Sequence, residues 1–316
     1  MEKIFSMING TINKSAVVEF REFIKKYSNV TKWYVCSDYC FGDDSKPNDV
    51  VSFVIYPHDI DIGLKQDYIQ SLQMKDLKKT RSINPDFCRF LHSGTFFSFN
   101  FILEKINYFN SWNNKDLQQH FVDTCIETVN QWKDTTPKNS ELYIEYAGRL
   151  RRFKNNMGSK SFNCALMARM LSVAFLAGYI KYLLLQEHKN LDLYSWLPDR
   201  DAITEWQDGI CEIFYHIMSH ELCTRHLTDP KIESKMEEIY FEANKTEQFY
   251  DQLNRVADYI CGTLADYDYN NGIVTAEKQC ILVEDAIADN SYIINISIAD
   301  KETKRIEHKR GIDTSQ

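Results

Sequence analysis

The chain has 316 residues, of which 44% are hydrophobic and 13% aromatic, so it can build a core of the size found in large enzyme domains. Its formal net charge of −8 excludes binding to nucleic acid through an overall positive field, so such binding needs local basic patches. Its nine cysteines include no Cys-x-x-Cys pair, which favours reduced thiols in a cytoplasmic protein.

Residues 1–30 predict a short leader followed by one helix. The side chains of Val17, Phe20, Phe23 and Ile24 recur at helical spacing and would face a core. The first ten residues contain too short an apolar stretch for a secretory signal, and they lack a small-residue cleavage site. We therefore expect a protein that stays in the cytoplasm.

Three β-strands are predicted next, at residues 32–38, 49–56 and 95–103. The first of them ends in Asp38.

Clusters of basic side chains could contact the phosphates of a nucleic acid, and such contacts are largely independent of base sequence. The competing interpretation of a basic cluster is a solvated helix face. Such a cluster lies between the second and third strands and consists of Lys75, Lys78, Lys79 and Arg81.

A long helical region follows, and residues 104–160 are expected to form an insertion. It contains a second basic cluster, to which the same two interpretations apply: Arg149, Arg151 and Arg152. Residues 164–185 are apolar over about the length that a bilayer requires, but Arg169 and Lys181 interrupt them. We predict a buried core helix here and no association with a membrane.

Acids again stand at the ends of elements in the next part of the chain. Residues 191–201 predict a fourth strand that ends in Asp199, Arg200 and Asp201, and either acid could instead cap a helix start. A short fifth strand is predicted at residues 236–243. The helix after it carries Asp258 at the edge of an apolar stripe, where a carboxylate must be paired, hydrogen-bonded or bound to metal.

After residue 270 the sequence predicts one or two further strands, at residues 281–283 and 292–298. The charged residues 301–316 predict a frayed tail. The expected organisation is thus a helical leader (1–30), a main domain with its insertion (31–270), and a C-terminal extension (271–316).

The order of these elements and acids resembles the domain-of-unknown-function 3800 family of prokaryotic proteins, which are expected to be ribonuclease-H-like. The resemblance covers roughly residues 30–270 and rests on the strand that leads into Asp38 and on the helix that carries Asp258. It implies an α/β fold with a mixed sheet in the order β-β-β-α-β-α-β-α. At the first motif this chain has Asp-Tyr-Cys-Phe-Gly where the family usually has Asp-Glu-Ser-Gly, so Asp43 or Asp44 would have to supply a second carboxylate.

Hydrolysis of a phosphodiester by two divalent cations requires hard oxygen ligands, which aspartates supply. We expect Asp38 to bridge two Mg²⁺ or Mn²⁺ ions, Asp199 or Asp201 to hold one of them, and Asp258 to complete the set. Arg200 would contact a phosphate or pair with an acid. These residues predict a metal-dependent nuclease acting on DNA or RNA, and the resemblance implies a role in antiviral defence or mobile-element biology.

Two other functions stay open. The first is a catalytically inactive ribonuclease-H-like module that binds nucleic acid or a protein partner, and the missing acid beside Asp38 supports it. The second is a zinc hydrolase, because His216, His220 and Cys223 fall at i, i+4 and i+7 of one predicted helix, with His226 following. This helix lacks the His-Glu-x-x-His motif of metalloproteases, and three ligands on one helix give poor tetrahedral geometry.

Overall fold

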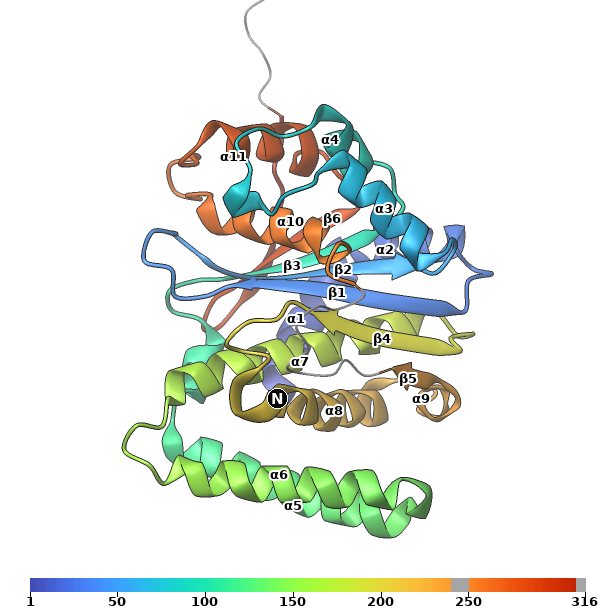
Figure 1. The fold of residues 1–316 in the computed structure, drawn as a ribbon, viewed down its shortest axis with the longest axis vertical. Coiled ribbons are helices and arrows are strands. Elements are labelled where there is room, and N and C mark those ends of the chain that lie inside the picture. Colours follow the sequence, from blue (N-terminus) through green and yellow to red (C-terminus); the bar gives the residue numbers. More distant parts are fainter. Residues whose placement is uncertain (240–249, 311–316) are drawn as a thin grey trace, which may run out of the picture.

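A seven-stranded mixed β-sheet forms the centre of the protein (Figure 1). The computed structural model describes residues 1–239 and 250–310. Across the sheet the strands lie in the order β5-β4-β1-β2-β3-β6-β7. Their bounds are β1 Lys32–Cys40, β2 Asp49–Pro57, β3 Phe97–Leu103, β4 Leu193–Pro198, β5 Glu237–Ile239, β6 Ile293–Ile298 and β7 Thr303–Ile306.

The three strands predicted near the N-terminus are confirmed as β1, β2 and β3, and the structure shows that they pair antiparallel. Strand β1 runs two residues beyond Asp38, so this acid lies inside the strand. Strand β4 is parallel to β1, and β5 is parallel to β4. Of the strand predicted at residues 236–243, residues 237–239 form β5, and residues 240–243 lie outside the described residues.

Helices cover both faces of this sheet (Figure 1). Helices α3, α4, α10 and α11 lie on one face, and α1, α2, α7 and α8 lie on the other. Helices α5 and α6 form a hairpin that packs beyond α8. The bounds are α1 Glu2–Ser15, α2 Val17–Lys26, α3 Ile62–Leu72, α4 Pro85–Leu91, α5 Lys115–Thr135, α6 Ser140–Met157, α7 Cys164–Glu187, α8 Trp206–His226, α9 Lys231–Lys235, α10 Asn254–Asp266 and α11 Glu277–Leu282.

Burial on both faces explains why the central strands have continuous runs of apolar residues rather than alternating apolar and polar residues. In β2 every residue after Asp49 is buried, because helices cover both sides of the sheet. The predicted apolar face of α2 is also confirmed, since Phe20 and Phe23 are buried and contact Phe97 of β3.

Helix α7 is long and apolar enough to cross a membrane by length and composition alone, and 94% of its most apolar window is buried inside the protein. It lies against the sheet and against α8 (Figure 1). The prediction of a buried core helix at residues 164–185 is therefore confirmed.

Two local predictions at the C-terminus are wrong. Residues 281–283 are helical rather than extended, because Leu282, Ala286 and Ile287 turn inward at helical spacing; a run of three apolar residues does not distinguish the two structures. Part of the expected frayed tail forms β7, which pairs with β6 and is tied to α1 by the hydrogen bond from Thr11 to the carbonyl of Thr303 (2.9 Å). The leader is itself helical, since residues 2–15 form α1, which the sequence did not predict.

Candidate active site

Asp38 and Asp199 lie side by side where β1 and β4 end. The parallel register pairs Ser37 with Pro198, and the backbone N–H of Asp199 donates to the carbonyl of Ser37 (2.7 Å). One step further along, Asp38 and Asp199 are therefore neighbours on adjacent strands. Paired residues on neighbouring strands point to the same face, so both side chains leave the sheet on the same side.

Helix α10 covers that side of the sheet. Tyr56, four residues from the partner of Asp38 on β2, donates its hydroxyl hydrogen to the carbonyl of Leu253 before the first turn of α10 (3.1 Å). At the other end Lys46 pairs with Asp266 (2.7 Å). Anchored at both ends, the helix presents Asp258 from its middle toward the two strand acids.

The charges of these carboxylates act on one another. Burial raises the pKa of Asp38 well above its usual value, and the negative charges of Asp258 and Asp199 raise it further. Burial also raises the pKa of Asp199 to about 6, with Asp201 and Asp258 contributing. The pKa of Asp258 is raised by burial as well, against the opposing effect of the N–H of Leu77. The structure therefore brings acids from three separate elements into one electrostatic cluster.

A basic segment is held against this cluster by α10. The N–H of Leu77 donates to the carboxylate of Asp258 (2.7 Å), and the hydroxyl of Tyr259 donates to the carbonyl of Lys75 (2.8 Å). A Cβ on Gly262 would come within 2.6 Å of the Leu77 side chain, so the glycine permits this close approach. Lys78 follows Leu77 directly in this segment, and its positive charge is a minor influence that lowers the pKa of Asp258 against the larger effect of burial.

The other predicted acids have different roles. Asp201 accepts hydrogen bonds from the N–H groups of Ile203 (2.8 Å) and Thr204 (3.1 Å), so it caps a turn rather than the helix start of the alternative interpretation, because α8 begins only at Trp206. Asp43 lies in the exposed turn after β1 and accepts from Ser45 (2.6 Å), which lowers its pKa. Asp44 is exposed in the same turn.

The remaining basic candidates have other partners or lie elsewhere. Arg200 directly follows Asp199 and pairs with Asp251 (3.1 Å). Arg149, Arg151 and Arg152 lie on α6, in the hairpin beyond α8 (Figure 1). There Arg149 donates to the carbonyl of Asp208 (2.5 Å). Of the two predicted basic clusters, only residues 75–81 lie beside the acids.

Within residues 1–239 and 250–310, no three acidic, histidine or cysteine side chains stand close enough together to hold a metal ion as placed. Carboxylates that carry like charges repel one another when no cation lies between them. The donor set nevertheless fits Mg²⁺ or Mn²⁺, because three partly buried carboxylates supply hard oxygen atoms from one side of the sheet.

The repulsion gives a testable pH dependence of stability. Asp199 binds its proton more tightly in the folded chain, so the free energy of unfolding falls as pH rises from about 4 through 6. The substitution Asp199→Asn should therefore raise the melting temperature at pH 8 in EDTA by a few degrees, about 2–4 °C for each kcal/mol removed, with no gain at pH 4. Melting curves of both proteins at the two pH values measure this. A variant that is less stable at pH 8 would contradict it.

Helix α8, on which the zinc alternative rests, takes part in a buried ionic network. Lys181 of α7 lies between Glu233 (2.8 Å) and Glu238 (2.9 Å). His220 contacts Glu233 (3.0 Å), and His216 stacks on Tyr146 with ring centroids 6.0 Å apart. The groups line a cavity of about 250 Å³ under the α5–α6 hairpin.

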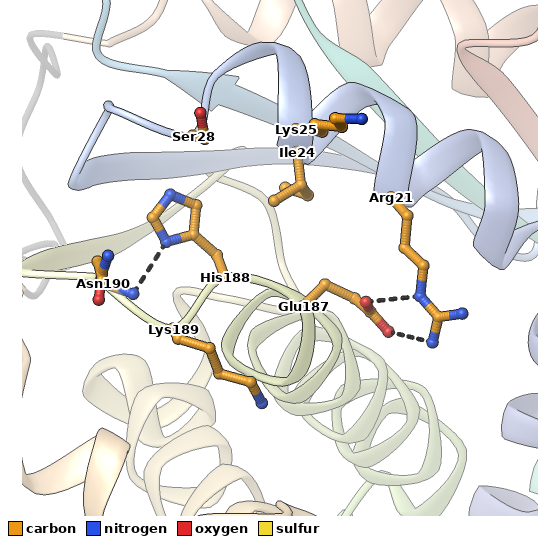
Figure 2. A pocket seen from close by; sticks show the side chains of 8 residues that line it. All are labelled: Arg21, Ile24, Lys25, Ser28, Glu187, His188, Lys189 and Asn190. Atoms are coloured by element: carbon orange, nitrogen blue, oxygen red, sulfur yellow. Dashed lines mark hydrogen bonds and ion pairs between the residues drawn. The ribbon is translucent and has the colours of Figure 1, made fainter.

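A second hollow, of about 320 Å³, lies at the opposite edge of the sheet, where β1 and β4 begin (Figure 2). It is lined by α2 and by the residues after α7, with Arg21 paired to Glu187 (2.7 Å) and His188 facing Asn190. Because β1 and β4 are parallel, this hollow is separated from the acidic cluster by the length of the strands.

Two features of the site escaped the sequence analysis. The first is the hydrogen bond from Leu77 to Asp258, which joins residues far apart in the chain through a backbone N–H, and a backbone donor has no sequence signature. The second is the Lys181 network. The lysine that interrupts the apolar helix was its only signal, and its two partners could not be identified from spacing.

The fold and site together define an α/β protein with a seven-stranded mixed sheet and an acidic cluster where two parallel strands end beneath a covering helix. No protein-family model, curated protein or solved structure matches this chain.

Proposed function

We propose that this protein is a ribonuclease-H-like, metal-dependent phosphodiesterase that cleaves nucleic acid. One observation carries the proposal: acids from β1, from the end of β4 and from α10 act on one another electrostatically on one side of the sheet. The order of the strands supports it, since three antiparallel strands are followed by helices, a parallel strand, helices, a parallel strand and a helix, as the resemblance implies, with α3 and α4 inserted between β2 and β3.

Asp38, Asp199 and Asp258 are the residues that would hold Mg²⁺ or Mn²⁺. Asp199 is preferred to Asp201, because Asp201 already accepts two backbone N–H groups in its turn. Two such ions, when bound, activate the attacking water and neutralise the leaving oxygen of a phosphodiester. The chain's own contribution is to fix the carboxylates on rigid elements and to hold the basic segment at residues 75–81 against α10 through the hydrogen bond from Leu77 to Asp258.

Cleavage of labelled single-stranded and double-stranded DNA and RNA, with Mg²⁺ or Mn²⁺, tests the proposal. Wild type should cut at least one of these substrates, and Asp258→Asn should not, although it keeps an oxygen that can accept from Leu77. EDTA should stop the wild-type reaction. Folded wild type that cuts no substrate under any of these conditions would contradict the proposal.

His220→Ala is the control that distinguishes the proposed nuclease from the alternative of a zinc hydrolase. His220 lies on α8, beneath the α5–α6 hairpin, and it contacts Glu233 rather than any acid of the cluster. The proposed nuclease should keep its full rate in this variant, whereas a zinc hydrolase that depends on this helix should lose it.

The inactive binding module is the second candidate, and the turn after β1 favours it. Tyr39 follows Asp38 directly, and its hydroxyl lies 2.6 Å from Ser37. Asp43, the nearest substitute, accepts from Ser45 in its own turn. A protein of this kind would bind nucleic acid equally well before and after Asp258→Asn and would cut nothing.

A further inference from the structure

We propose that the hollow lined by residues 71–75 and 79–85 binds a single strand of nucleic acid and leads it to the acidic cluster. This inference rests on the proposed function and specifies its substrate as single-stranded. It follows from the shape of the hollow, from its charge, and from its attachment to α10.

The hollow is the right size for part of an extended strand. Its volume is about 860 Å³, within the range of about 300–1,000 Å³ that ligand sites occupy. It is formed by the last turn of α3, the segment after it, and the start of α4. A concave site of this kind admits nucleotides that project from a flexible strand, whereas a duplex presents a wide, regular cylinder.

The charge of the hollow is positive in a protein whose net charge is −8. Lys75, Lys79 and Arg81 line it, and none of its lining residues is a carboxylate. Lys79 pairs with Asp76 (2.9 Å). Among the residues that the structure describes, Lys75 and Arg81 have no carboxylate within 4.0 Å, so the side chains of both are available to a phosphate.

The same segment is fixed to the acidic cluster. Leu77, between the two parts of the lining, donates its N–H to Asp258, and Lys278 donates to the carbonyls of Leu77 (2.7 Å) and Thr80 (3.1 Å). Leu77 and Lys78 stand in the chain between Lys75 and Lys79, which line the hollow. A strand that occupies the hollow therefore passes within reach of the acids.

Exposed apolar side chains beside these cations suit unstacked bases. Met74 lines the hollow and is 71% exposed. Tyr68 lies six residues earlier, on α3, where its ring contacts Phe90 and 53% of its surface is exposed. Basic grooves with aromatic stacking partners are how proteins bind single strands without sequence preference.

Fluorescence anisotropy in EDTA, where no cleavage occurs, tests the inference. The probes are labelled single-stranded DNA and RNA about 12 nucleotides long, within the site size of single-strand binders, and a duplex of the same length. Wild type should bind single strands at least about tenfold more tightly than duplex, with affinity falling as salt rises. The double variant K75E/R81E should weaken single-strand binding at least about tenfold and flatten the salt dependence by about 0.7 for each lost contact.

The matched control is R151E/R152E, which makes the same charge change on α6, away from the hollow. It should leave single-strand affinity within about twofold of wild type.

Three outcomes would overturn the inference: equal affinity for duplex and single strand, equal losses in K75E/R81E and R151E/R152E, or displacement of the strand by polyglutamate as readily as by unlabelled oligonucleotide. Cleavage is measured separately with Mg²⁺. If K75E/R81E cleaves nucleic acid at the wild-type rate, the proposed function stands and this inference is contradicted. If the wild type binds single strands at the hollow but cleaves none of the substrates, strand binding stands and the proposed nuclease function is contradicted.

Discussion

The substitution Asp38→Asn should reduce metal-dependent cleavage by at least about 100-fold, and it should leave the protein folded. Loss of a residue that merely supports a metal ligand costs about 10–100-fold, so loss of a ligand costs at least as much. Asn keeps the shape of the side chain and removes the negative charge that Asp258 and Asp199 repel. Initial rates at saturating Mg²⁺, with circular dichroism to establish folding, measure the effect.

Asp43→Asn is the matched control for this prediction. It removes the same charge in the turn that follows β1, from a side chain that is exposed and accepts from Ser45. Its cleavage rate should stay within about threefold of wild type. Equal losses of cleavage rate in the two variants would show that a carboxylate from the turn also belongs to the site, in addition to the cluster of Asp38, Asp199 and Asp258.

The substitution Lys181→Ala should lower the free energy of unfolding by about 3–5 kcal/mol, the cost of leaving buried carboxylates without their cation. Lys181 is only 2% exposed, and both Glu233 and Glu238 depend on it. Urea unfolding of both proteins measures the loss. Lys189→Ala, which removes an exposed lysine after α7, should change stability by no more than about 0.5 kcal/mol. A Lys181→Ala variant as stable as this control would contradict the prediction.

The network also predicts how that loss depends on pH. Burial alone would raise the pKa of Glu233, but Lys181 and His220 lower it to about 2. A carboxylate with a lowered pKa stabilises the fold above its unfolded value of about 4.3, and this contribution is lost as pH falls toward about 2. The pKa of Lys181 is raised by the two glutamates against its burial, so its contribution is present below its usual value and is lost only at strongly alkaline pH. The difference between wild type and Lys181→Ala should therefore be constant near neutrality and shrink below about pH 4.

The sequence predicted the positions of strands and helices best where a pattern of apolar residues repeats. Continuous apolar runs located β1 to β4, and the helical spacing of Phe20 and Phe23 located α2. Placing Asp38 and Asp199 near one another required only strand order, because residues in register on neighbouring parallel strands lie side by side. Asp258 joins them through α10, which packs on β1 and β2.

What the sequence could not predict depends on contacts between distant residues. The short run at residues 281–283 fits a strand or a helix, and burial in the fold decides for the helix. Two basic clusters were equivalent as patterns, and only the hydrogen bonds of residues 75–81 to α10 place one of them beside the acids. The partners of Lys181 come from α9 and β5, more than fifty residues later in the chain.

The central claim is that Asp38, Asp199 and Asp258 bind divalent cations, and calorimetric titration of Mn²⁺ into the protein tests it most directly. Wild type should bind two ions at pH 8, with weaker binding below about pH 6, where Asp199 takes up a proton. Asp38→Asn should lose saturable binding, and Asp43→Asn should keep it. Folded wild type without saturable Mn²⁺ binding, or with binding that Asp38→Asn leaves unchanged, would contradict the claim.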